Sequence, residues 1–182
     1  YDGDFADPFM LAVDGTYYAY ATSTTDQTLP VIELRRGEPA TLRDVALSLP
    51  SWSTGEAQWA PAVFAAGDTY VLYFTTMSST TGRQCVSFAT ASQPLGPFRD
   101  DSSEPFVCQE DLGGTIDPSV VVDDRGDPWL LYKNDGNCCE LPTSLWSRQL
   151  AADGRSFVGE PHRLLTAERE WEDGLIEAPS MI

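Results

Sequence analysis

Short runs of apolar and β-branched residues alternate with polar ones along this chain, and most of the runs end at a Gly or Asp turn. A period of two is typical of half-buried strands. Pairs of runs flank Asp14-Gly15, Gly67-Asp68 and Arg125-Gly126, which favour hairpins. A third run follows each pair, at 31–35, 84–89 and 144–150. The helical period is weak, and its best stretch is 41–49, so the pattern predicts an all-β protein.

The same pattern repeats along the chain. Each copy begins with a proline before an apolar run, at Pro8, Pro61, Pro118 and Pro179, with spacings of 53, 57 and 61 residues. Such a period is in the range of propeller blades. A single small blade cannot bury both of its faces, so blades pack radially against their neighbours.

The length then sets how much of a propeller the chain can hold. At roughly 57 residues per blade, a five-bladed ring would need about 285 residues. The 182 residues are therefore predicted to form about three blades and the start of the fourth, with copies beginning near 7, 60, 117 and 178. We expect residues 1–182 to be a single β-propeller module that is incomplete at its C-terminal end.

Carboxylates occur at matching places in these copies. Asp7 and Asp117 immediately precede the repeat proline, and Glu177 lies one position earlier in its copy, where the second copy has Trp59. A single Asp-Pro is more often part of a turn, so it is the matching position of the acids in several copies that indicates a function. Innermost strands line the channel of a propeller, which predicts that three acids and an indole meet at one mouth. Acids suit cleavage of a glycosidic bond, and an aromatic face suits the C–H surface of a sugar ring.

Composition excludes several other classes of function. The chain has 28 acidic and 11 basic side chains and a net charge of -17, which repels phosphate backbones and anionic lipids. Nucleic acid and membrane surfaces are therefore not expected partners. Because His162 is the only histidine, multi-histidine metal sites cannot form. The acidic turn 123–127 lacks the Glu that completes an EF-hand loop, so neither a metal nor another cofactor is expected.

The four cysteines lack the Cys-x-x-Cys spacing of zinc and redox motifs. Disulfides are favoured, with Cys85 joined to Cys108 and with Cys138 and Cys139 adjacent, where a vicinal bridge could form. Free buried thiols are the alternative. Because disulfides persist in oxidising compartments, the first reading predicts an exported protein.

Four motifs, taken in order, resemble those of glycoside hydrolase family 43, whose members are five-bladed propellers that trim arabinose- and xylose-containing polysaccharides. They are Phe5-Ala6-Asp7-Pro8, Trp59-Ala60-Pro61, Ile116-Asp117-Pro118-Ser119 and Ile176-Glu177-Ala178-Pro179. The resemblance implies that Asp7 is the general base and Glu177 the general acid, while Asp117 adjusts the pKa of the acid and orients the sugar. It also implies that Trp59 and Ile116 contact the substrate.

These roles make physical demands. An inverting hydrolase needs about 6.5 to 9.5 Å between its two carboxyl groups, and separate blades can supply that gap. The acid must be protonated near neutral pH, so Glu177 needs burial or a nearby negative charge, which Asp117 can provide. The stretch 133–137 follows a predicted strand, and it forms either part of the pocket rim or a loop held by the adjacent cysteines.

The predicted function is a secreted, monomeric, inverting hydrolase. It would remove terminal α-L-arabinofuranosyl units from plant-type polysaccharides or oligosaccharides that contain pentoses. β-Xylosidase and β-galactofuranosidase activities are alternatives, and so is a carbohydrate-binding propeller without catalysis, because fold alone does not decide function.

Overall fold

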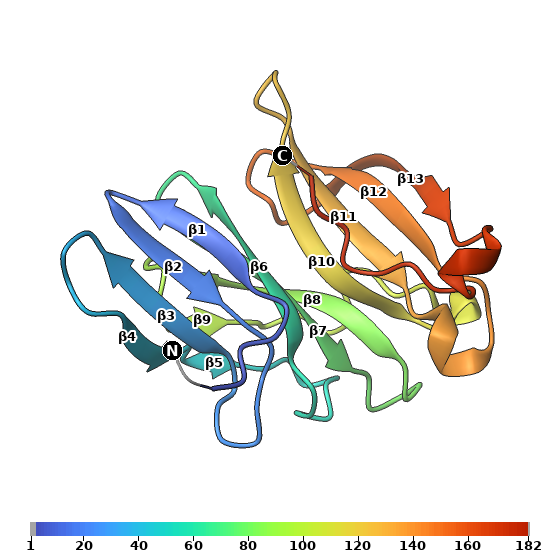
Figure 1. The fold of residues 1–182 in the computed structure, drawn as a ribbon, viewed down its shortest axis with the longest axis horizontal. Helices are drawn as coiled ribbons and strands as arrows, with labels where there is room; N and C mark the ends of the chain where they lie inside the picture. Colours follow the sequence, from blue (N-terminus) through green and yellow to red (C-terminus); the bar gives the residue numbers. More distant parts are fainter. Residues whose placement is uncertain (1–2, 182) are drawn as a thin grey trace.

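A computed structural model describes residues 3–181, and strands dominate it (Figure 1). The strands are β1 (Phe9–Val13), β2 (Thr16–Tyr20), β3 (Pro30–Arg35), β4 (Thr41–Asp44), β5 (Leu47–Ser48), β6 (Trp59–Ala66), β7 (Thr69–Met77), β8 (Gln84–Ala91), β9 (Phe98–Arg99), β10 (Thr115–Val122), β11 (Pro128–Asn134), β12 (Ser144–Leu150) and β13 (Phe157–Thr166). Three short 3-10 helices complete the described structure: η1 (Glu110–Leu112), η2 (Gly136–Cys139) and η3 (Glu170–Glu172). None of the helices in residues 3–181 has the length and apolarity needed to cross a membrane.

The strands form three sheets in the orders β1-β2-β3-β4, β5-β9-β8-β7-β6 and β10-β11-β12-β13. Each sheet is an antiparallel meander, except that β5 joins the middle sheet parallel to β9. The innermost strands β1, β6 and β10 adjoin one another, and the sheets fan out from them as successive blades (Figure 1). The three predicted blades, their hairpins and their third strands are confirmed.

The stretch 41–49, the best helical candidate in the sequence, holds β4 and β5 instead. The all-β prediction therefore holds even in this stretch, because its residues find sheet partners. β4 pairs with β3, and the side chain of Asp44 accepts the N–H of Leu29 at 3.1 Å. Val45, only 3% exposed, packs into the core. Residues 178–181, the predicted start of a fourth blade, form no strand, and no described segment pairs with them.

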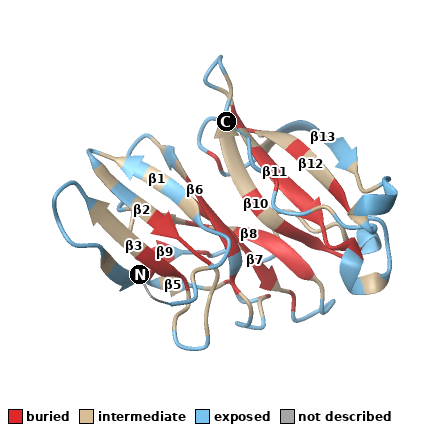
Figure 2. Cartoon of the chain, viewed as in Figure 1, coloured by how far each residue is buried: buried red, intermediate tan, exposed pale blue. Residues whose placement is uncertain are grey.

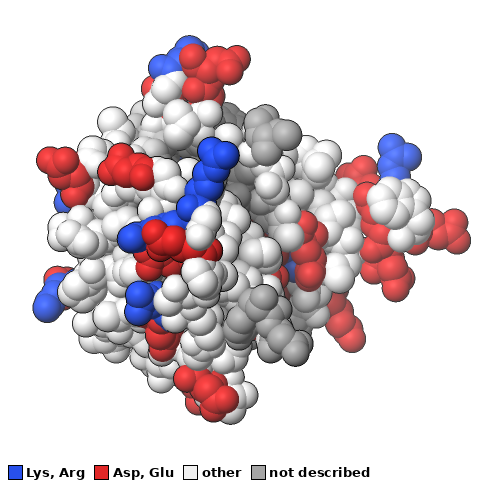
Figure 3. Space-filling view, turned by 60° about the vertical axis from the view of Figure 1, so that its left-hand side comes forward, with Lys and Arg blue, Asp and Glu red and all other residues white. Residues whose placement is uncertain are grey.

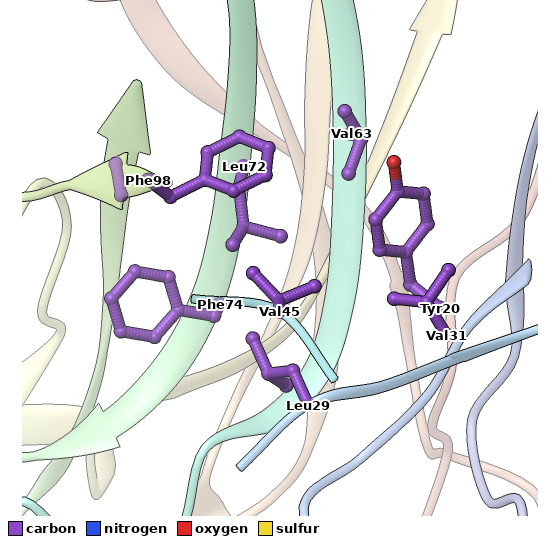
Figure 4. Packing of buried hydrophobic residues seen from close by; sticks show 9 residues of the cluster. Tyr20, Leu29, Val31, Val45, Val63, Leu72, Phe74 and Phe98 are labelled. Carbon is purple, nitrogen blue, oxygen red and sulfur yellow. The ribbon is translucent and has the colours of Figure 1, made fainter. Parts of the chain in front are cut away.

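The middle blade is buried on both faces, as Figure 2 shows in red. Side chains alternate along β7, so Leu72 and Phe74 join one core cluster while Val71 and Tyr73 join another. The first cluster lies against blade 1 and is drawn in Figure 4, and the second lies against blade 3. Full burial of such side chains stabilises the fold by about 1.5–3 kcal/mol each. This two-sided burial explains why the run around Tyr70–Phe74 is almost continuously apolar.

Both favoured disulfides are present, and no described cysteine is free. Cys85 in β8 is bonded to Cys108, which lies 23 residues further on. Cys138 is bonded to Cys139 within η2, and the guanidinium of Arg83 donates to both of these sulfurs. The vicinal bridge thus fixes the turn that follows β11.

The acidic turn after β10 satisfies its own polar groups. Asp123 accepts the backbone N–H groups of Asp127 at 3.0 Å and Arg125 at 2.9 Å, and also the indole N–H of Trp129. These bonds, led by the one from Asp127, lower the pKa of Asp123 to about 2. The carboxylate therefore serves as the organising acceptor of a hairpin turn.

Candidate active site

The inner segments share an unusual backbone conformation immediately before each repeat proline. Asp7, Ala60, Asp117 and Ala178 have φ values of 51°, 44°, 54° and 51°. Non-glycine residues rarely occupy this left-handed region, and such strain concentrates at functional sites. The ladder shifts register between Trp59 and Ala62 in β6 and at the equivalent place in β10. A bulge of this kind re-aims a side chain out of the regular sheet.

Asp117 is the central carboxyl of the candidate site. It is half-buried, and its Oδ2 accepts the backbone N–H of Ala178 at 3.0 Å, next to Glu177. Burial is the main cause that raises the pKa of Asp117, and the charges of Glu177 and Asp7 raise it further. The hydrogen bond from Ala178 and the charge of Lys133 act in the opposite direction. Asp117 therefore lies near enough to both Glu177 and Asp7 to feel their charges.

Asp7 is exposed and is held by a bridge between two blades. Its Oδ2 accepts the hydroxyl of Thr22 at 2.6 Å, and the same Thr22 oxygen accepts the N–H of Ala60 at 2.9 Å. The backbone of blade 2 thus fixes the hydroxyl that orients the acid of blade 1.

Glu177 has a cationic partner. Its Oε1 lies 2.8 Å from Nζ of Lys133, whose side chain is 0% exposed, while the Glu177 side chain is 47% exposed. The same Nζ donates to Oδ1 of Asn137 at 2.8 Å. The carboxyl expected near Glu177 is that of Asp117, but the group in direct contact with Glu177 is a cation.

A fourth carboxyl, Asp135, completes this cluster. Burial is the main cause that raises the pKa of Asp135, and the charges of Asp117 and Glu177 raise it further. The positive charges of Lys133 and Arg83 act in the opposite direction. The stretch 133–137 therefore contributes a cation, a carboxyl and an amide beside the predicted acid. It also leads into the vicinal disulfide, as the reading of a loop held by the adjacent cysteines expected, while its place on the pocket rim stays a prediction.

The remaining predicted contact residues differ in exposure. Trp59 is 36% exposed at the start of β6, whereas Ile116 is 7% exposed and offers little surface to a ligand. Their substrate contacts stay predictions. Thr22 was missed because a lone Thr after a strand carries no sequence signal. Lys133 was only noticed as part of its loop.

A cavity of about 440 Å³ runs along the inner segments, with Asp7 and Asp117 in its wall beside the repeat prolines. Trp59 and Glu177 are not among the described residues that line it. Its volume lies in the range of small-ligand sites. Two of the three predicted acids, Asp7 and Asp117, therefore face one cavity.

Radially arranged sheets with carboxyls from two blades in the wall of one cavity are typical of a β-propeller with a site of the glycosidase type. A comparison with family profiles agrees: Glycosyl hydrolases family 43 matches residues 1–182. The chain belongs to this family, and its members are enzymes that act on O-glycosyl bonds.

Individual relatives are more distant. Extracellular endo-alpha-(1->5)-L-arabinanase 1 of Bacillus subtilis (strain 168) is 24% identical, over 96% of this chain and 54% of the relative. An endo-arabinase structure from Bacteroides thetaiotaomicron VPI-5482 has a TM-score of 0.76 at 22% identity, covering 91% of this chain and 57% of that chain. An alpha-L-arabinofuranosidase structure from Clostridium thermocellum ATCC 27405 has a TM-score of 0.66 at 21% identity, covering 87% and 55%. This chain thus spans about half the length of these proteins.

Proposed function

We propose that this protein hydrolyses α-L-arabinofuranosyl linkages at the ends of pentose-containing polysaccharide chains, with inversion at the anomeric carbon. One observation carries the proposal: Asp117 binds the backbone N–H beside Glu177 and feels the charges of both Glu177 and Asp7. Asp117 therefore interacts with acids from two other copies of the repeat. The extracellular relative and the two disulfides support secretion.

Each acid has a defined task in this reaction. Asp7 takes a proton from water as the water oxygen attacks the anomeric carbon, and Glu177 gives a proton to the departing glycosidic oxygen as the C–O bond breaks. Asp117 places a further carboxyl near Glu177 and orients the sugar. Each proton transfer of this kind typically contributes about 10²- to 10⁴-fold in rate.

A neutral substrate fits the charge of the protein. The net charge is -17, and acidic groups outnumber basic ones across the face in Figure 3. A neutral polysaccharide meets no repulsion there, and its hydroxyl groups can donate to the carboxylates at the mouth.

The decisive test uses the purified protein with aryl α-L-arabinofuranoside, aryl β-D-xyloside and linear arabinan. We expect arabinose release, with the inverted anomer seen first by NMR. Glu177→Gln should abolish turnover while the affinity for arabino-oligosaccharide stays within a few-fold of wild type. Wild-type turnover in that variant, or sugar binding without turnover in the unaltered protein, would refute the proposal.

Endo-acting arabinan hydrolysis is the second candidate, because the Bacillus subtilis and Bacteroides thetaiotaomicron relatives carry that description. Product analysis on linear arabinan separates the two. An exo enzyme releases arabinose from the start, whereas an endo enzyme first produces a ladder of oligosaccharides and a rapid fall in viscosity.

A further inference from the structure

Lys133 is the only lysine in the sequence; the other basic side chains among the 11 are arginines. It lies at the end of β11, opposite Ile116 in the ladder and thus beside the bulge that carries Asp117. Its side chain is 0% exposed. Burial of an ammonium is costly unless it is well paired, so its partners indicate what it does.

Acidic groups surround this ammonium from several elements. Glu177, in the segment after η3, is in direct contact, and Asn137 in η2 accepts a second hydrogen bond from Nζ. Asp117 in β10 and Asp135 after β11 both feel the charge of Lys133. Further out, Arg83 acts on Asp135, and Asp7 acts on Asp117. The contact with Glu177 is thus the one direct ion pair described within this cluster.

We propose that Lys133 is a positioning residue that aims Glu177 and, through its charge, sets the alkaline limit of activity. This inference rests on the function proposed above. A lysine suits the task better than an arginine because a compact ammonium has three donors on one atom. Two of the three bind Asn137 and Glu177, and together they hold the carboxylate against one side of the mouth.

The direction of the charge effect follows from the contact. A cation at 2.8 Å favours the ionised carboxylate, whereas a general acid must hold its proton. The charges of Asp117 and Asp135, which also act on Glu177, oppose the cation. The ammonium of Lys133 is therefore the charge in direct contact with the group that must donate a proton.

The test compares Lys133→Met and Lys133→Arg with wild type in full pH profiles of kcat and kcat/KM. With Lys133→Met we expect kcat to fall by about 10²-fold, because the acid is no longer held in position. The alkaline limb of kcat/KM should move to higher pH. Lys133→Arg keeps the charge, so its limb should stay near that of wild type although kcat falls. Arg125→Met, which removes an exposed surface cation, is the matched control and should leave the profile unchanged.

Two further readouts separate positioning from a merely structural role. Aryl arabinofuranosides with activated leaving groups need little protonation, so the Lys133→Met defect should shrink as the leaving group improves. In the double variant Lys133→Met/Glu177→Gln, activity should be no lower than in Glu177→Gln alone, since both changes act on one group. An unchanged alkaline limb together with a leaving-group dependence like that of wild type would overturn the inference.

The proposal can also be tested if Lys133→Met fails to fold. Asn137 is exposed, so Asn137→Ala should fold, and it should lower kcat in the same direction by a smaller factor. Lysine labelled with ¹³C at Cε should give a signal for Lys133 that moves in Glu177→Gln; a signal that stays in place contradicts the ion pair. If Glu177→Gln remains fully active, the proposed function itself fails. If that variant is inactive and Lys133→Met keeps the wild-type profile, only this inference fails.

Discussion

Replacing Thr22 with Val should impair catalysis and stability through two different contacts of one oxygen. The substitution keeps the shape of the side chain but removes the hydroxyl that donates to Asp7 at 2.6 Å and accepts from the N–H of Ala60 at 2.9 Å. Asp7 is exposed, so water can replace the lost donor but cannot hold the carboxylate in place. The buried N–H of Ala60, in a residue 8% exposed, has less access to water.

The magnitudes follow from these surroundings. A hydrogen bond to a charged group contributes about 1.5–3 kcal/mol, and the exposure of Asp7 places this one near the lower end. About 1.4 kcal/mol corresponds to a tenfold change in rate, so kcat/KM should fall roughly tenfold. The unpaired N–H of Ala60 should lower the free energy of unfolding by about 1–3 kcal/mol, and each kcal/mol should lower the Tm by about 2–4 °C in a chain of this size.

Thr22→Ser is the matched control, because it keeps the hydroxyl and loses only a methyl group. The assay is initial-rate kinetics on an aryl arabinofuranoside, with thermal unfolding followed by circular dichroism. We expect kcat/KM of the Ser variant to stay within about twofold of wild type, whereas that of the Val variant falls about tenfold. Equal kcat/KM in the Ser and Val variants would refute the claim that the hydroxyl orients Asp7.

Three further substitutions test other parts of the fold and site. Asp117→Asn should lower kcat/KM by about 10²- to 10⁴-fold. Because burial raises the pKa of Asp117 in the folded state, its ionisation lowers the free energy of unfolding of the wild type above that pKa. Urea unfolding should therefore show a variant that is more stable than wild type at neutral pH by an amount that shrinks in acid, and an amount that grows in acid would contradict the assignment. Tyr73→Phe removes the buried hydroxyl that donates to the carbonyl of Gly154 at 2.5 Å, a link between blades 2 and 3. The loss should lower the free energy of unfolding by about 1–3 kcal/mol and leave kcat unchanged. Urea unfolding that matches wild type would show that this link does not stabilise the fold. Joint replacement of Cys85 and Cys108 by Ala opens a loop with a sequence separation of 23 and should lower the free energy of unfolding by about 3 kcal/mol, and a loss below 1 kcal/mol by the same method would rule out chain entropy as its main contribution.

The sequence predicts the three blades well because their core depends on local alternation. Strands such as β7 and β11 are long, apolar and β-branched or aromatic, and their turns contain glycine. The outer strands are harder to predict. β4 (Thr41–Asp44) and β13 are largely exposed and polar, so they depend on hydrogen bonds to an inner neighbour and carry little pattern of their own.

The same distinction applies to the site. The matching positions of Asp7, Asp117 and Glu177 in the repeat predict that they lie close together, because equivalent positions lie at equivalent radii. No such rule applies to Thr22 or Lys133, since each acts through a contact between segments that are distant in the chain. Thr22 reaches Ala60 across 38 residues, and Lys133 reaches Glu177 across 44. Only the packing of the blades creates these contacts.

The shared backbone conformation also explains why two of the acids are aspartates and the third is a glutamate. Asp7 and Asp117 themselves occupy the left-handed position before proline, and Asp tolerates that region several times more readily than most residues. Glu has no such tolerance, and Glu177 instead precedes the left-handed Ala178. Its extra methylene group extends its reach from one position further back. The difference in side-chain length therefore matches the difference in position: Asp occupies the left-handed residue before proline, and the longer Glu stands one residue before it.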